Sequence, residues 1–129
     1  SYLKAIEIKH DFADAHSNLG NLLRAIGNLK DAELSQRKAI ELNPNYAIAH
    51  FNLGNILRDL GKLKEAEQCY RKAIELNPDF VEFYLNLVSI LIDLGKGKEA
   101  KLWSDKQMSL RPWSIIGYRL SVLTNLIMK

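Results

Sequence analysis

Three asparagines stand at a regular interval in this sequence. Asn18, Asn52 and Asn86 are each 34 residues apart, and Asn21 and Asn55 each lie three residues after one of them. An amide side chain has both donor hydrogens and an acceptor oxygen, so a row of amides can bind the N–H and C=O groups of an extended peptide whatever its sequence. The spacing therefore predicts a surface that binds a polypeptide backbone.

Other side chains fall on the same expected helical face as the asparagines. Arg24 and Arg58 keep the interval and could meet an acidic side chain of a ligand, although pairing with Asp59 or Asp93 of the chain itself is an equal alternative. Phe51, Leu85 and Ile92 would offer apolar anchor points, or else pack half-buried. The predicted groove comprises Asn18, Asn21, Arg24, Phe51, Asn52, Asn55, Arg58, Leu85, Asn86, Ser89 and Ile92.

Catalytic and metal-binding patterns are weak. His16 and His50 are one interval apart and not an i, i+4 pair, so we interpret them as packing residues and not as zinc ligands. The segment 95–98 has glycines and lysines but lacks the rest of a phosphate-binding loop. We predict no enzymatic activity, no cofactor and no metal.

Composition narrows the class of partner. The net charge of +3 is mildly basic, and the Lys and Arg residues expected on the second helices are mixed with Glu, which is typical of a solvated face. Nucleic acid is therefore not a predicted partner; a protein or peptide is. No run approaches the roughly 18 apolar residues that a membrane helix needs, so a membrane is not predicted either. Cys69 is the sole cysteine, which rules out an intrachain disulfide, fits a reducing compartment and indicates a cytoplasmic location.

The elements that would position these side chains repeat with the same interval. Residues 13–46 and 47–80 are identical at 22 of 34 positions. Glycines at 27, 61 and 95 and prolines at 44, 78 and 112 keep the step, and each can end a helix. A period of 34 is typical of stacked helix–turn–helix units. We predict an all-α, right-handed superhelical solenoid of antiparallel helix pairs.

Each first helix carries an apolar stripe that should face the core. In the second repeat the stripe is Ala49, Leu53, Ile56, Leu57 and Leu60, and the first repeat copies it with Ala15, Leu19, Leu22, Leu23 and Ile26. Gly20 and Gly54 beside these stripes should let the paired helices approach closely. Because Val88 and Gln107 replace small residues of the pattern, we expect looser or shifted packing in the third repeat.

The order Leu-Gly, turn Gly, Ala, aromatic, Ala and Pro in residues 47–80 resembles the tetratricopeptide repeat. Residues 13–46 follow it with Gln36 in the aromatic place. The run 52–55 (Asn-Leu-Gly-Asn) resembles bacterial arrays and the repeat region of protein O-glycosyltransferases. That resemblance implies that Asn18, Asn52 and Asn86 hold a peptide backbone in an inner groove.

The two ends of the sequence extend the repeat pattern. Residues 1–12 align with 69–80, with His10 in place of the proline, and predict the second helix of a truncated repeat. Three repeats follow at 13–46, 47–80 and 81–114, and residues 115–129 predict a C-terminal helix. That helix is apolar on several sides, so homo-oligomers through it or through the open array ends are a further expectation.

These features predict a non-catalytic scaffold that binds an extended peptide or a helix in its concave groove. Two alternatives stay open at this point. The chain could be the substrate-presenting arm of a larger enzyme such as a glycosyltransferase, or a module that assembles with itself.

Overall fold

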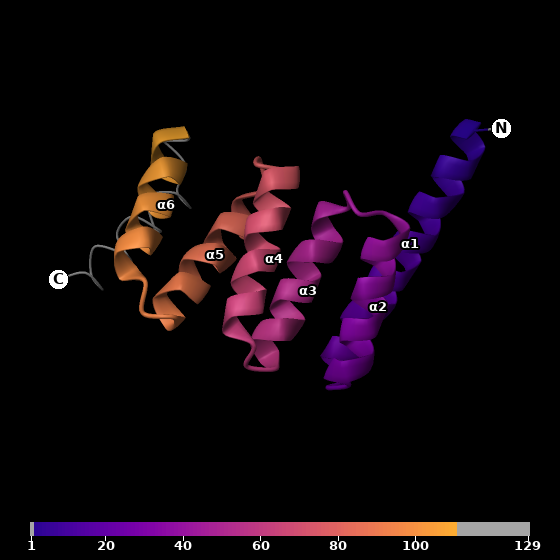
Figure 1. Cartoon of the computed structure of the whole chain (residues 1–129), viewed down its shortest axis with the longest axis horizontal. Helices are drawn as coiled ribbons and strands as arrows, with labels where there is room; N and C mark the ends of the chain where they lie inside the picture. Colours follow the sequence, from indigo (N-terminus) through magenta and orange to yellow (C-terminus); the bar gives the residue numbers. More distant parts are fainter. Residues whose placement is uncertain (1, 111–129) are drawn as a thin grey trace. The chain divides into compact units, whose positions relative to one another are not determined.

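The computed structural model describes residues 2–110, which form six α-helices and no strand within that range. The helices are α1 (Tyr2–Ala25), α2 (Leu29–Leu42), α3 (Ala47–Asp59), α4 (Leu63–Leu76), α5 (Val81–Asp93) and α6 (Gly97–Leu110), and they pack in adjacent pairs (Figure 1). The predicted all-α repeat fold is confirmed. The helix predicted over 115–129 lies outside the described residues.

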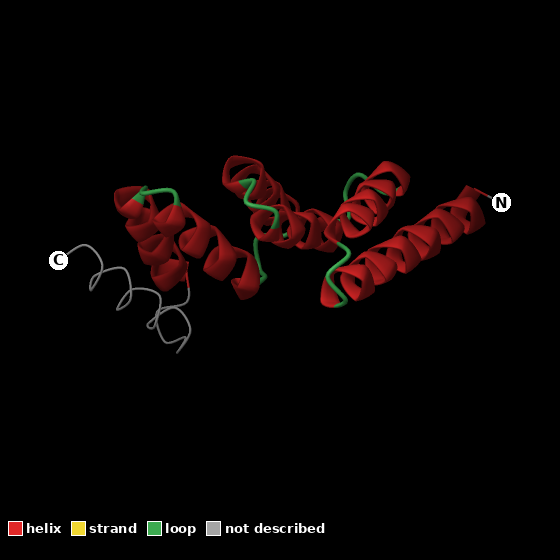
Figure 2. Cartoon of the chain, turned by 90° about the horizontal axis from the view of Figure 1, so that it is seen from below, coloured by secondary structure: helices red, strands yellow, loops and turns green. Residues whose placement is uncertain are grey.

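Two compact units divide the chain after Pro78. In the first unit α1 packs against α2, α3 packs against α4, and α2 and α3 connect the two pairs. In the second unit α5 packs against α6. Short loops join the helices, as Figure 2 shows. Among the described helices, none has the length and apolar character that crossing a membrane requires.

The first helix of each pair ends at the predicted glycine. Gly27, Gly61 and Gly95 adopt φ values of 86°, 80° and 79°. After α3, the Gly61 N–H bonds to the Arg58 carbonyl and the Lys62 N–H to the Leu57 carbonyl, at 3.0 and 2.8 Å. The same two bonds recur after α1 and α5 and make a Schellman motif at each end. The 34-residue glycine spacing thus sets three identical turns.

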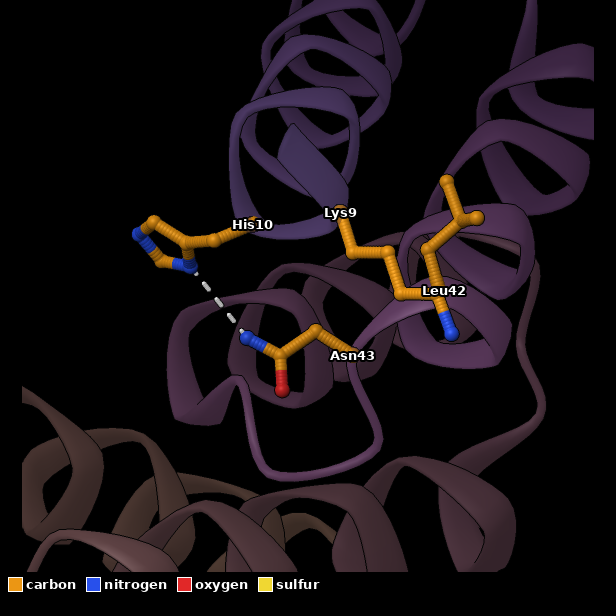
Figure 3. A pocket seen from close by; sticks show the side chains of 4 residues that line it. All are labelled: Lys9, His10, Leu42 and Asn43. Atoms are coloured by element: carbon orange, nitrogen blue, oxygen red, sulfur yellow. Dashed lines mark hydrogen bonds between the residues drawn. The ribbon is translucent and has the colours of Figure 1, made fainter. Parts of the chain in front are cut away.

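Helix α1 runs without interruption through residues 12 and 13, where the repeat alignment has its first boundary. The later repeats have Pro44 and Pro78 at the corresponding turns, whereas His10 keeps the backbone N–H that a helix needs. The His10 side chain lies against the loop after α2, with its Nδ1 3.3 Å from Asn43 Nδ2 (Figure 3) and its ring 5.5 Å from that of Tyr46.

The apolar stripes of α3 and α5 are buried as predicted, but the stripe of α1 is not. Leu53 is 3% exposed, whereas Leu19, at the same place in the preceding repeat, is 45% exposed. Leu22 and Ile26 are also exposed. The expectation that this stripe faces a core is wrong for the described structure: α2 packs on α3, whereas no helix within residues 2–110 covers the corresponding face of α1.

Glycines make room for large residues on the second helices. A Cβ added to Gly54 would come within 2.6 Å of the Tyr70 ring, and one added to Gly20 would come within 2.6 Å of the Gln36 amide. In the second unit Val88 takes the glycine place and Ser104 the place of the large residue, and both are buried. In the third repeat the first helix therefore carries the larger of the two side chains and the second helix the smaller, the reverse of the first two repeats.

Candidate peptide-binding surface

The three asparagines of the 34-residue row lie in different environments. Asn18 on α1 is exposed, and Asn86 on α5 is half-buried. Asn52 on α3 is 8% exposed and donates from Nδ2 to the Ser17 hydroxyl of α1 at 3.1 Å. The row is thus not uniform: Asn52 joins two neighbouring helices, while Asn18 is exposed to solvent. The contact of these amides with a peptide stays a prediction.

Asn21 and Asn55 make the same contact in successive repeats. Asn55 Oδ1 accepts a hydrogen bond from the Tyr70 hydroxyl at 2.6 Å, and Asn21 Oδ1 accepts one from Gln36 Nε2 at 3.3 Å. Each bond links the first helix of a repeat to the second. Because the Asn21 oxygen faces α2, the NH₂ group of Asn21 is the part of that amide that could bind a ligand's carbonyl group.

Arg24 makes a two-pronged ion pair with Asp59. Its Nε and Nη2 lie 2.6 and 3.3 Å from the two carboxylate oxygens, and the pair joins α1 to the end of α3. This hydrogen bond raises the pKa of the Arg24 guanidinium above its ordinary value. The alternative in which Arg24 pairs within the chain is confirmed. A helical wheel drawn from the sequence could place each residue on a face of its own helix, but it could not show that the two side chains meet.

A pocket of about 300 Å³ lies at this ion pair. Asn21, Arg24, Ala25 and Asp59 line it, so it combines an amide, a guanidinium and a carboxylate where α1 and α3 lie side by side. The pocket brings together two of the predicted groove residues, Asn21 and Arg24. We expected Asp59 only as an ion-pair partner of an arginine and not as a residue of the binding surface. Its place directly after Arg58, a predicted groove residue, was the signal in the sequence that could have indicated it.

The apolar members of the predicted set are half-buried. Phe51 lies with its ring 5.9 Å from the Tyr70 ring, tilted by 49°. Arg58 on α3 and Leu85, Ser89 and Ile92 on α5 are likewise half-buried. Phe51 therefore has a packing role within its own repeat, the alternative weighed from sequence, and keeps only part of its surface for a ligand.

The side chains of His50 and Cys69 lie in surroundings that indicate a structural role. His50 Nε2 donates to the Pro44 carbonyl at 2.9 Å and ties the start of α3 to the preceding turn. Burial raises the pKa of the Cys69 thiol to about 11, so the thiol stays protonated near neutral pH and is a poor nucleophile. Within residues 2–110 no three His, Cys, Asp or Glu side chains cluster as metal ligands would.

Comparison with protein families agrees with this repeat geometry. Three models of the tetratricopeptide repeat match, over residues 47–80, over 20–57, and over 1–33 with 69–101. The last alone covers half of the chain. The chain belongs to the tetratricopeptide repeat family. Among curated proteins no sequence matches significantly.

Solved tetratricopeptide repeat structures share the fold. YrrB, described as having an unusual peptide-binding site, superposes with a TM-score of 0.75 at 24% identity, over 96% of this chain and 64% of its own. The repeat domain of Arabidopsis OM64 gives 0.78 at 20% identity, covering 91% and 97% of the two chains. The first repeat domain of Spaghetti (RPAP3), solved with an HSP90 peptide, gives 0.80 at 19%, covering 92% and 94%.

Proposed function

We propose that this chain is a non-catalytic scaffold that binds an extended peptide on the face shared by α1 and α3, and that an acidic side chain of the peptide binds Arg24. The pocket formed by Asn21, Arg24 and Asp59 carries this proposal, because it places a guanidinium and an amide together at the surface. Peptide binding by structural relatives such as YrrB and the Spaghetti domain supports the class of ligand.

The Arg24–Asp59 pair can exchange its carboxylate at low cost. The side chains are 40% and 35% exposed, and an exposed ion pair contributes about 0–1 kcal/mol. A ligand carboxylate can therefore replace Asp59 on the planar guanidinium and recover the same two hydrogen bonds. In this reading Asp59 holds Arg24 in place before the ligand arrives and competes with the ligand for it.

The exposed amide of Asn18 lies one turn from Asn21 and would bind the peptide backbone beside the acidic side chain. Such contacts do not depend on the peptide sequence. An isolated surface of this size should bind at about micromolar Kd, because ordering a flexible peptide offsets much of the contact energy.

A random linear peptide library displayed against the chain tests this function. We expect the selected peptides to be enriched in Asp and Glu. Arg24→Gln should remove that enrichment and weaken a selected acidic peptide by up to about fivefold, since an exposed ion pair contributes about 0–1 kcal/mol. Asp59→Asn should strengthen the same peptide, because the competing carboxylate is gone.

Two further variants separate the backbone contacts from a general effect. Asn18→Ala should weaken acidic and neutral selected peptides equally. Arg37→Gln, which removes an arginine paired with Glu33 on α2, should leave binding unchanged. Selected peptides that bind Arg24→Gln and Asn18→Ala as tightly as the native chain would place the binding surface elsewhere.

A further inference from the structure

A second pocket lies between the first turns of α2 and the turn that joins α3 to α4. Its volume is about 360 Å³, and its lining residues are Lys30, Glu33, Leu34, Leu60 and Lys62. The start of α2 and this turn lie at the same end of the first unit (Figure 1). None of these residues lines the pocket of Asn21, Arg24 and Asp59, so the two pockets are separate sites.

Each wall of the second pocket supplies one leucine and one lysine. Leu34 follows Lys30 by four residues, which places the two side chains on one face of α2. On the other wall Gly61, with its φ of 80°, turns the chain after α3 and separates Leu60 from Lys62. The sequence thus sets two apolar side chains, each near a cation, against one another.

The exposure of Leu34 is a property of its place in the repeat. Leu34 is 64% exposed, although α4 follows on one side of α2. Gln68 holds the same place on α4 and is also exposed, although α2 lies on the other side and is joined to α4 by the Arg37–Glu65 ion pair at 3.7 Å. Neighbouring helices therefore do not cover this place, and core packing does not explain a leucine there.

Positive charge dominates the surface around the apolar floor. The Glu33 side chain is only 18% exposed, and its carboxylate oxygens lie 2.9 Å from Arg37 Nε and 3.9 Å from Lys62 Nζ. Lys62 is 49% exposed. Lys30 is exposed and forms no ion pair within residues 2–110. Because complementary charges favour association, the pocket fits an acidic partner.

The open form of the pocket favours a segment of a protein over a small molecule. Sites for small molecules bury about 70–90% of the ligand's surface. Leu34 forms much of the floor and is itself largely exposed, so the walls cannot enclose a small ligand to that extent. A protein segment can insert one side chain into the pocket and cover Leu34 with the surface beside it.

We propose that this pocket is a second docking site, for a partner segment that carries a large apolar side chain between acidic residues. The apolar side chain packs on Leu34 and Leu60, and the carboxylates bind Lys30 and Lys62. Because exposed ion pairs stabilise weakly, a short peptide should bind with a Kd of about 1 mM. Such a peptide is lost when a displayed library is washed, so this site does not contribute to selection by the face of α1 and α3.

A ¹H–¹⁵N NMR titration with the blocked peptide acetyl-Asp-Phe-Asp-amide tests the site. We expect saturable shifts in the amides of residues 30–34 and 60–62. Acetyl-Asn-Phe-Asn-amide and acetyl-Asp-Ala-Asp-amide should each bind about fivefold more weakly, because one lacks the charges and the other the apolar side chain. Equal binding of either control peptide would overturn the assigned chemistry of the partner.

Variants of the chain locate the site. Leu34→Gln introduces the residue that α4 carries at the same place, so the helix should be preserved while binding weakens about fivefold. Lys30→Gln should weaken binding about two- to fivefold. The matched control is Lys64→Gln, at the place on α4 that corresponds to Lys30, and it should change nothing. Shifts of full size in Leu34→Gln would overturn the pocket as the site.

The same spectra distinguish this pocket from the face of α1 and α3 and from other occupants. Arg24→Gln should leave the titration unchanged, so the two proposals can fail separately. Shifts in residues 30–34 that grow with protein concentration in the absence of peptide would show that a second copy is the occupant. Decanoate that binds there more tightly than the acidic peptide would show a site for small amphiphiles. Either result would overturn the assignment to a partner segment.

Discussion

Where the two helices of a repeat cross, one glycine decides how much room the second helix has. Gly54→Ala gains about 1 kcal/mol of helix propensity but drives a Cβ into the buried Tyr70 ring, and such overpacking costs about 1–3 kcal/mol. Because the added Cβ would come within 2.6 Å of a fully buried ring, we expect an overpacking cost of about 2–3 kcal/mol and hence a net loss of about 1–2 kcal/mol in the free energy of unfolding, measured by urea denaturation. Gly20→Ala faces the more flexible Gln36 chain and should change stability by less. A Gly54→Ala variant as stable as the native chain would contradict this account.

Gln36 occupies a site shaped for an aromatic ring. It lies under Gly20 as Tyr70 lies under Gly54, and its Oε1 is buried without a hydrogen-bond partner. Gln36→Tyr would bury an aromatic ring, remove the unpaired oxygen and place a hydroxyl near Asn21, as Tyr70 does with Asn55. We expect a gain of about 1–2 kcal/mol by thermal denaturation. Gln36→Leu, which cannot donate to Asn21, should gain less. A loss of stability in Gln36→Tyr would show that the two sites differ in shape.

At the scale of the element, Tyr46 fastens α1 to the loop between α2 and α3. Burial and then the hydrogen bond to Asp14 raise the pKa of Tyr46 to about 12, so the bond stabilises the fold below pH 10, the ordinary pKa, and is lost as pH rises toward 12. Tyr46→Phe should cost about 1 kcal/mol at pH 7. The difference in unfolding free energy between the two proteins should shrink between pH 10 and 12. A difference that does not change with pH would mean that the bond is not what Tyr46 contributes.

Helix ends were the most predictable part of the fold, because a glycine or a proline acts within its own turn. The three glycine turns and the ends of α2 and α4 follow directly from such residues. The continuous α1 follows from a missing signal: His10 has no proline ring, yet alignment with the other repeats suggested a boundary. The residue at position 10 alone, and not the overall similarity of residues 1–12 to residues 69–80, decided that the helix continues.

The surface was less predictable, because it depends on which neighbours are present. A helical wheel gave Asn18 and Asn52 the same orientation, but Ser17 of the adjacent helix buries and bonds one of them. Likewise Leu19 and Leu53 hold equivalent places and differ in exposure, since α2 packs on α3 while no helix within residues 2–110 covers the same face of α1. Periodicity fixes the direction of a side chain, while burial requires knowledge of the next helix.

For the molecule as a whole, stability in a repeat protein comes from contacts between neighbouring helices, so a helix lacking a neighbour on one side is the least protected. The first turns of α1 extend beyond its packing partners, and isolated helical segments of this length are marginal in water. Among residues 2–110, hydrogen exchange should therefore be fastest in residues 3–9 and slowest in α3, whose stripe is buried.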